Sequence, residues 1–293
     1  MFRVVQPLLI AELIFAGCSL SPRSKKGEGQ PAPGETWNLL RQPSSFQERH
    51  GKNARSNPAP FQVVQISFKV LRIDLPADRI RHSRKIWNHV DESRVEPELT
   101  TRLVRNGLRV GAAAPGAWPA IATVLEACGA RTHEDRLVAQ SNLPVTIIID
   151  TIRDPESIFL YERSHALVGK TFPMGEKLIT LEYAYRPELG GCTDLQVELE
   201  VRHDLQRMDW EHHDGIVRQV PAMDRHVFID LKAVLTLRPS EFLVIGPSEK
   251  ADHTYLVGNR FFTRQDSGME PYETLFCITP EPFSPHAGQR DSS

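Results

Sequence analysis

A cluster of imidazoles and carboxylates just before residue 215 is the part of the chain best equipped for chemistry. Its members are His203, Asp204, Asp209, Glu211, His212, His213 and Asp214, with His226 further along. Imidazole nitrogens and carboxylate oxygens bind zinc, and a bound metal ion activates water for hydrolysis. One interpretation is therefore an extracytoplasmic metal-dependent hydrolase that uses His203, His212 or His213 together with Asp209 or Asp214.

Two features of the cluster favour a solvated interaction loop over a metal centre. Adjacent side chains of an extended chain point in opposite directions, so His212 and His213 would not converge on one ion. The polar composition is also typical of a loop. We therefore predict no metal and no cofactor. Trp210, as an aromatic residue in an acidic loop, becomes the candidate contact to a partner protein, together with Asp209 and Glu211.

No sequence pattern for catalysis accompanies the cluster. The motifs HExxH, GxSxG, GxGxxG and the Walker pattern are absent from the 293 residues. The 35 basic and 37 acidic side chains give a net charge of −2, so the chain has no general electrostatic attraction for nucleic acid. These observations predict a non-enzymatic protein that does not bind nucleic acid.

The N-terminus has the layout of a secretory signal peptide. Arg3 precedes an apolar stretch that ends in Phe15-Ala16-Gly17-Cys18. These four residues resemble the bacterial lipobox, which implies that residues 1–18 form a lipoprotein signal peptide and that Cys18 becomes the lipid-modified first residue. Lipid on Cys18 would hold the protein at a membrane surface, facing the periplasm. Plain secretion to the periplasm and a wrongly assigned start codon are the alternatives.

Residues 19–60 are predicted to be a disordered tether. They contain six prolines and few large apolar residues, and their seven basic and three acidic residues give a charge of +4. Such a stretch cannot bury enough apolar surface to offset the entropy lost on ordering. The tether would let a folded module stand away from the membrane.

Residues 61–135 alternate between strand and helix patterns, which predicts a small α+β domain. The stretch 61–75 is rich in β-branched and aromatic residues, and a change of alternation at Val70-Leu71 predicts a β-bulge. Asp78 is the predicted cap of a helix over 80–90. The remaining predicted elements are a helix from Pro97 to Asn106-Gly107, a strand over Leu108–Val110 and a helix over Trp118–Cys128.

After Gly129 short β-like runs follow one another, separated by turn residues. Leu195–Val201 alternates strictly between apolar and polar residues, as in a strand with one buried and one wet face. Val227–Leu237 and Thr254–Phe262 are two of the longer predicted strands. The predicted fold class is therefore α+β: a small N-terminal α+β domain (61–135), then a mainly antiparallel β domain (136–280), then a disordered tail (281–293).

The order of short sequence motifs in the second half resembles that in the C-terminal domain of bacterial secretins, the outer-membrane pores of secretion and pilus systems. The motifs are Leu195–His203, Val220-Pro221, Arg238-Pro239-Ser240-Glu241, Phe242–Gly246, Val257–Phe262 and Glu273–Pro280. The resemblance covers about 165–282 and implies a secretin-like β domain. It does not extend to the two amphipathic hairpins with which a secretin lines and crosses the membrane. An antiparallel sheet of another family fits the same pattern.

Together these features predict a non-enzymatic cell-envelope lipoprotein. Its role would be structural, or in assembly, through the secretin-like β domain, in a secretion or pilus-type system. The expected partners are envelope proteins or further copies of the chain, with the membrane reached through Cys18. The metal-dependent hydrolase is the alternative.

Overall fold

The computed structural model describes residues 65–139, 143–213, 216–264 and 270–283. The predicted signal peptide with Cys18, the predicted tether and the tail beyond Phe283 lie outside these residues. The described residues belong to one compact unit.

Two antiparallel sheets and one separate hairpin form the framework. The first sheet, sheet A, has the order β2-β11-β13-β1-β3, with β12 against β13. Its strands are β1 (Gln65–Pro76), β2 (Leu108–Ala113), β3 (Arg131–Ala139), β11 (Phe242–Pro247), β12 (Thr263–Arg264) and β13 (Tyr272–Phe283). Sheet B has the order β10-β8-β7-β4, and β9 also pairs with β8. Its strands are β4 (Val145–Ile152), β7 (Gly175–Arg186), β8 (Cys192–His213), β9 (Ile216–Val227) and β10 (Ala233–Leu237). The hairpin consists of β5 (Glu156–Tyr161) and β6 (Leu167–Phe172).

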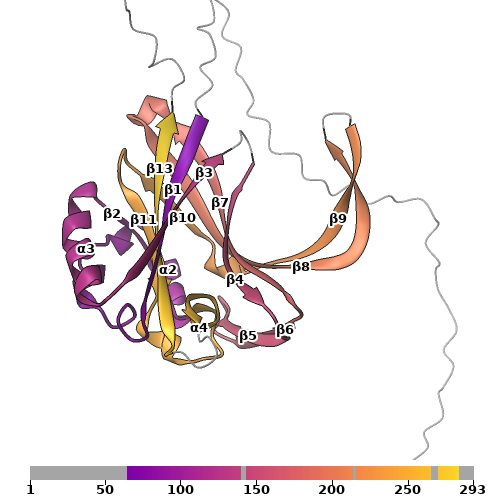
Figure 1. Cartoon of the computed structure of the whole chain (residues 1–293), viewed down its shortest axis with the longest axis horizontal. Helices are drawn as coiled ribbons and strands as arrows, with labels where there is room; N and C mark the ends of the chain where they lie inside the picture. Colours follow the sequence, from indigo (N-terminus) through magenta and orange to yellow (C-terminus); the bar gives the residue numbers. More distant parts are fainter. Residues whose placement is uncertain (1–64, 140–142, 214–215, 265–269, 284–293) are drawn as a thin grey trace, which may run out of the picture. The chain divides into compact units, whose positions relative to one another are not determined.

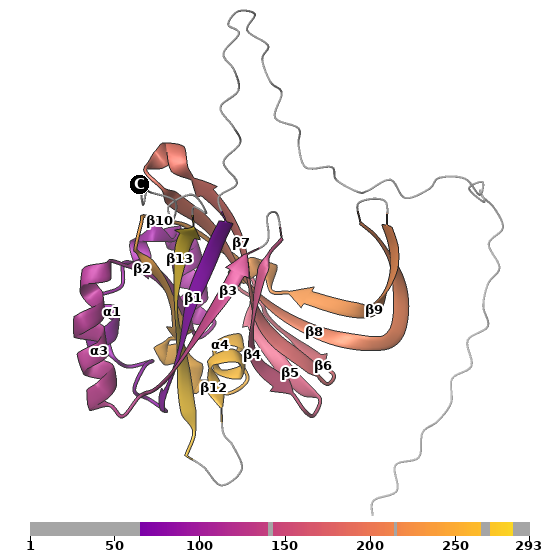
Figure 2. The ribbon, with the colours of Figure 1, turned by 45° about the horizontal axis from the view of Figure 1, so that its top comes forward.

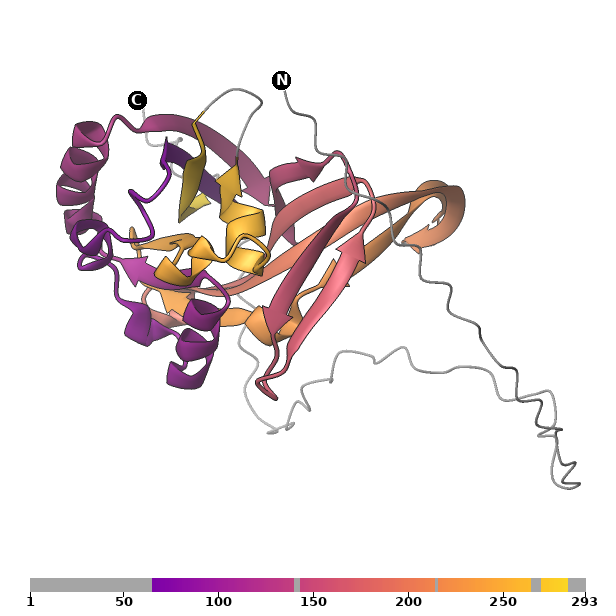
Figure 3. The ribbon, with the colours of Figure 1, turned by 90° about the horizontal axis from the view of Figure 1, so that it is seen from below.

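Short helices cover the sheets. The α-helices are α1 (Arg84–Trp87), α2 (Pro97–Arg105), α3 (Trp118–Ala127) and α4 (Val257–Phe262). Single 3₁₀ turns lie in the connections between helices and strands: η1 (Glu92–Arg94) between α1 and α2, η2 (Pro115–Ala117) between β2 and α3, η3 (Pro187–Leu189) between β7 and β8, η4 (Ile229–Leu231) between β9 and β10, and η5 (Glu249–Asp252) between β11 and α4. Helices α1 and α3 lie on the side of sheet A that faces away from sheet B, so the layers run helices, sheet A, sheet B (Figures 1 and 3).

The predicted α+β fold class is wrong. The described residues form a mostly antiparallel β structure, and the stretch predicted to be a separate N-terminal domain contributes strands to sheet A. Strand β1 pairs along its whole length with β13, near the opposite end of the described chain, and β2 pairs with β11. The local strand-helix-strand pattern was correct, but strand partners come from sequence-distant residues that periodicity does not identify.

The predicted bulge at Val70-Leu71 is also wrong, because the register of β1 with β13 runs without a shift. The change of alternation has another cause. Ile66, Phe68 and Val70 point into the core between the two sheets, whereas Ile73 and Leu75 lie on the other face of the strand, in the core beneath α1 and α3. A single regular strand thus serves two cores in succession. Strands β11 and β13 do so residue by residue, which explains their unbroken apolar sequence.

Several helices and strands of the structure have other boundaries than those predicted. The helices after Pro97 and over Trp118 and the strand after Gly107 are present. The helix predicted after Asp78 is reduced to the single turn α1, capped by Ser83, and Asp78 itself has a left-handed φ of 69°. The predicted strand Val227–Leu237 is divided by η4.

The predicted strand Thr254–Phe262 is instead the helix α4. Gly258 in this helix packs against the turn that follows α2, where its amide donates to the carbonyl of Asn106. A Cβ atom at residue 258 would lie 2.0 Å from the carbonyl oxygen of Gly107. This close approach explains the glycine before Phe261 and Phe262, both of which are fully buried.

A buried carboxylate holds the loop that leaves β1. Glu273, on β13, is fully buried and accepts hydrogen bonds from the amides of Asp78 (3.0 Å), Ile80 (2.9 Å) and Arg81 (3.2 Å). The guanidinium Nε of Arg81 also donates to it. Arg81 in turn binds Asp252 at 2.7 Å. One side chain therefore ties the loop to the centre of sheet A.

We expect Glu273→Gln to lower the free energy of unfolding by about 3 kcal/mol, because it leaves the buried guanidinium of Arg81 without its main partner. Urea unfolding at pH 7 measures the change. Glu134→Gln, on the exposed edge strand β3, is the matched control. A loss no larger than that of the control would contradict this role for Glu273.

Candidate protein-binding arm

The predicted loop around Trp210 is instead a two-stranded arm. Strand β8 pairs with β7 up to Arg202 and with β10 over Thr193–Val197. Beyond Arg202 it pairs with β9 alone, as far as His213. The arm formed by β8 and β9 extends away from the two sheets and curves (Figures 1 and 2). The loop prediction failed because a ribbon exposed on both faces lacks the buried apolar face that marks a strand in the sequence.

The register of the arm gathers apolar side chains on one of its faces. Met208 lies opposite Pro221 and Trp210 lies opposite Gln219, and alternate residues of a strand share a face. The same face therefore carries Met208, Trp210, Val217, Pro221 and Met223. Met208 is 54%, Trp210 63% and Val217 50% exposed. We call these five residues the apolar face of the arm.

The three predicted partner contacts do not all lie on this face. Trp210 belongs to it. Asp209 pairs with Val220, which places Asp209 on the opposite face, and Glu211 pairs with Arg218 in the ladder. The side chain of Glu211 lies outside the described residues. Sequence reasoning overlooked Met208, Val217 and Met223, although the spacing of two in 208–210 and 217–223 would have identified the face once the hairpin around Asp214-Gly215 was assumed.

The alternative metal ligands are spread along the arm. His203 sits where the arm begins, 3.7 Å from Asp224. His212 and His213 lie near its far end, and their side chains lie outside the described residues. Nine residues of extended strand separate His203 from His212, which is more than about 20 Å. His203 therefore cannot share one metal ion with the other two.

Another group with metal-ligand chemistry is found at the loop after β1. Ligand atoms of Asp78, His82 and Asp252 lie within 4.8 Å of one another. The guanidinium of Arg81 contacts both carboxylates, at 3.1 Å and 2.7 Å. A cationic side chain thus already occupies the place between these acids, so the group is an ion-pair cluster and not a metal centre.

The base of the arm is fixed by a second buried carboxylate, which sequence reasoning missed. Glu200 is fully buried on β8. Arg202 binds it at 2.6 Å, Arg225 on β9 binds it at 2.6 Å, and Thr180 on β7 donates to it at 3.3 Å. These four residues, here called the arm base, join β7, β8 and β9 at the point where the sheet becomes a two-stranded arm.

Burial and hydrogen bonding act on Glu200 in opposite directions. Burial by itself would raise the pKa of the carboxyl, but the hydrogen bonds and charges of Arg225 and Arg202 outweigh it and hold the pKa below the ordinary value of 4.5. Glu200 is therefore ionised at neutral pH, and its pairing contributes stability until the carboxylate is protonated.

An aromatic cluster lies on the face of the strands opposite the arm base. The ring of His226 on β9 lies 5.1 Å from those of Phe172 and Phe228. Burial, and then the nearby charge of Lys170, lower the pKa of His226, so this imidazole is neutral at pH 7. His226 thus packs against aromatic rings on the face opposite the arm base, where it is the diagonal cross-strand neighbour of His203.

Comparisons with known proteins give weak similarity to secretin structures. A cryo-EM structure of the Salmonella SPI-1 type III secretion injectisome secretin InvG is 13% identical, with a TM-score of 0.22, and the match covers 78% of this chain and 67% of that one. The basal body structure with InvG, PrgH and PrgK gives the same identity and TM-score, with 47% of that chain covered. The InvG secretin domain β-barrel gives 12% and 0.21. Likeness at this level assigns neither fold nor activity.

No protein-family model and no curated protein matches the chain. None of the helices within the described residues is both long enough and apolar enough to cross a membrane.

We expect Glu200→Gln to lower the free energy of unfolding at pH 7 by about 2 kcal/mol, because it removes the charge that Arg202 and Arg225 bind. The pKa of Glu200 is lowered in the folded state, so its contribution is complete above the ordinary value and is lost as the pH falls below it. Urea titrations at pH 7 and pH 3 measure this. The difference between wild type and variant should shrink at pH 3; a constant difference would contradict the assignment.

Proposed function

We propose that this protein is a non-enzymatic, lipid-anchored protein of the cell envelope that assembles with further copies of itself through the arm. The lipid would be attached at Cys18, and the folded unit would stand off the membrane on the tether 19–60. The protein would have a structural role in a secretion or pilus-type system, as the secretin-like motifs in the sequence suggest.

The observation that carries the proposal is the exposure of the apolar face of the arm. Trp210 is 63% exposed although it is a large aromatic residue, and it shares the face with the exposed residues Met208 and Val217. Exposed apolar patches of this kind mark protein interaction sites. Aromatic side chains also dominate the binding energy of interfaces.

The hydrogen-bonding edges of the arm support assembly for a separate reason. A two-stranded ribbon is only marginally stable in water, and beyond Arg202 each strand pairs only with the other within the described residues. Edge strands add further strands readily. A copy of the same arm offers a matching apolar face and matching edges, which is why we favour self-association over a different envelope protein.

Four of the six motifs that resemble secretins lie in the two sheets, one is a turn, and Val257–Phe262 is the helix α4. Leu195–His203 lies in β8 and ends where the arm begins, Phe242–Gly246 lies in β11 and Glu273–Pro280 lies in β13. Arg238-Pro239-Ser240-Glu241 forms the turn between β10 and β11, where the amide of Arg238 donates to the carboxylate of Glu241. The proposal of a secretion or pilus-type system rests on these motifs and not on the comparison with solved structures.

Replacing the aromatic residue of the apolar face tests self-association. We expect the full-length chain to form multimers, and Trp210→Ser to weaken the association about 30-fold, as expected for an aromatic hot spot. Light scattering on the eluate of a size-exclusion column measures both. Val234→Ser, at another exposed apolar residue on β10, is the matched control. A monomeric wild type at all concentrations would contradict self-association.

Replacing the predicted lipidation site tests the anchor. We expect wild-type protein in the membrane fraction and Cys18→Ala in the soluble periplasmic fraction, because an acyl chain and not a spanning helix would hold the protein. Mass spectrometry of the mature N-terminus identifies the modification. Cys192→Ala, at a thiol within the folded unit, is the control. Membrane association that persists in Cys18→Ala would contradict lipid anchoring.

A further inference from the structure

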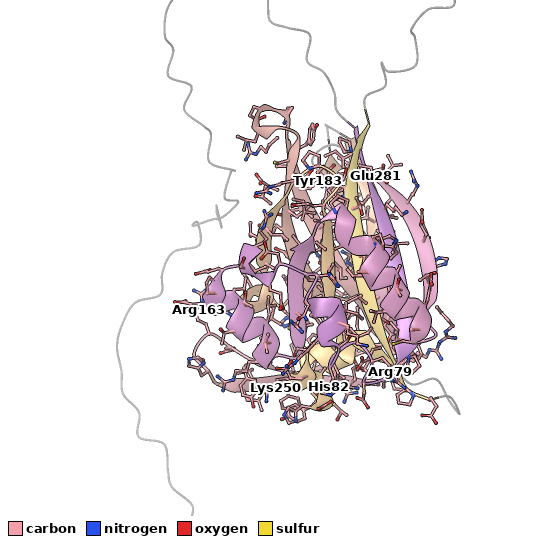
Figure 4. The ribbon with its side chains drawn as sticks, turned by 90° about the vertical axis from the view of Figure 1, so that its left-hand side faces the viewer. Arg79, His82, Arg163, Tyr183, Lys250 and Glu281 are labelled. Atoms are coloured by element: carbon pink, nitrogen blue, oxygen red, sulfur yellow. The ribbon has the colours of Figure 1, made fainter. Side chains whose placement is uncertain are left out.

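A charged cavity of about 840 Å³ lies apart from the arm. Its walls come from the loop after β1, the turn between β4 and β5, strand β7, and the segment from α4 to β12. In Figure 4, Arg79, His82 and Lys250 mark one end of the molecule, opposite Tyr183 and Glu281. The cavity is found at that end, because Asp78, Arg81 and Asp252 belong to its lining. A cavity of this volume is within the range of small-molecule sites.

Five charged residues of the lining form a connected network. The Nζ of Lys177 lies 2.6 Å from Glu156, 3.8 Å from Asp150 and 2.7 Å from the carbonyl oxygen of Arg260, and its side chain is 4% exposed. Arg260 approaches Glu156 at 4.0 Å, and Arg264 approaches Asp150 at 3.6 Å. Three cations and two carboxylates thus contact one another within this part of the lining.

Several donors of the network have no acceptor. Within the described residues, four buried donor atoms have no hydrogen-bond partner: Nε and Nη2 of Arg264, Nε of Arg260 and Oγ1 of Thr263. One buried acceptor, Oε1 of Glu156, also makes no hydrogen bond, although Nζ of Lys177 lies 2.6 Å from it. The contact of Arg264 with Asp150 is too long for a hydrogen bond. Covered guanidinium donors without acceptors are costly, and native proteins rarely keep them unless a ligand or ion completes the set.

A small oxyanion of low charge can supply the missing acceptor. A planar guanidinium donates two parallel hydrogen bonds to a carboxylate or phosphate, and the hydroxyl of Thr263 adds a third donor. A dianion would be repelled by the carboxylates in the lining, of which Asp150, Asp154 and Glu156 lie on the same wall. A carboxylate therefore fits the site better than a phosphate dianion does.

We propose that this cavity binds the carboxylate of a small molecule or of a peptide C-terminus, through Arg264, Arg260 and Thr263. Lys177 is a positioning residue, because it holds Glu156 and Asp150 beside the two arginines. The site is independent of the arm, so it would operate in a single copy of the chain and does not depend on the proposed assembly.

Calorimetry on the full-length chain tests the proposal with four probes: propionate, alanyl-alanine, alanyl-alanine amide and inorganic phosphate. We expect saturable binding of one equivalent of alanyl-alanine and at least about tenfold weaker binding of its amide, which lacks the charged acceptor. Propionate that binds as tightly as the dipeptide would identify small acids as the ligands. Tighter binding of the dipeptide would identify peptide C-termini.

Substitutions in the charged network test whether it forms the binding site. Arg264→Gln should weaken the binding of alanyl-alanine at least about tenfold, as one charge-assisted pair is lost. Arg136→Gln, at an exposed arginine on β3, should leave it unchanged. If circular dichroism shows that Arg264→Gln is unfolded, Arg260→Gln decides, because this side chain is 36% exposed and less important to packing. Three results would overturn the proposal: no saturable binding of either carboxylate, equal affinity for the amide, or tighter binding of phosphate.

Discussion

The pairing of β1 with β13 is the constraint on which the rest of the structure depends. Its register joins Gln65 to Phe283 and Pro76 to Tyr272 without a break, so the two strands form the middle of sheet A. Their side chains fill both cores, the one shared with sheet B and the one beneath α1 and α3. Glu273 then fixes the loop that leaves β1, and that loop forms a wall of the charged cavity. The placement of one strand thus determines both cores and the cavity.

The arm depends on sheet B in a comparable way. Leu195, Val197, Leu199 and Val201 anchor the first half of β8 in the core, while Glu200 on the opposite face binds Arg202 and Arg225. The second half of the same strand receives no such support and carries an exposed apolar face. A rigid half and an exposed half in one continuous strand make β8 suited to presenting a binding surface at a fixed place.

Local features could be predicted from the sequence, but partners could not. The helices after Pro97 and over Trp118 and the alternation of Leu195–Val201 follow from residue periodicity and were found. The separate N-terminal domain was wrong because nothing in 61–135 shows that β13 is the neighbour of β1. The arm was taken for a loop because both of its faces are exposed, and Glu200 looked like an ordinary polar residue of a wet face. The charged cavity is lined by segments far apart in the sequence: Arg81 and Asp150 both lie more than one hundred residues before Arg264. No local sequence pattern therefore predicts it.

The pairing of β1 with β13 also has a consequence for how the chain folds. Ser67 and Glu281, which face each other in the ladder, are 214 residues apart. Closing so long a loop is entropically unfavourable, and folds dominated by distant pairings form slowly. Sheet A cannot close until Tyr272–Phe283 has been synthesised, and until then the apolar faces of β1 and β11 lack their central neighbour. Sheet A of a nascent chain would therefore remain open until β13 has emerged.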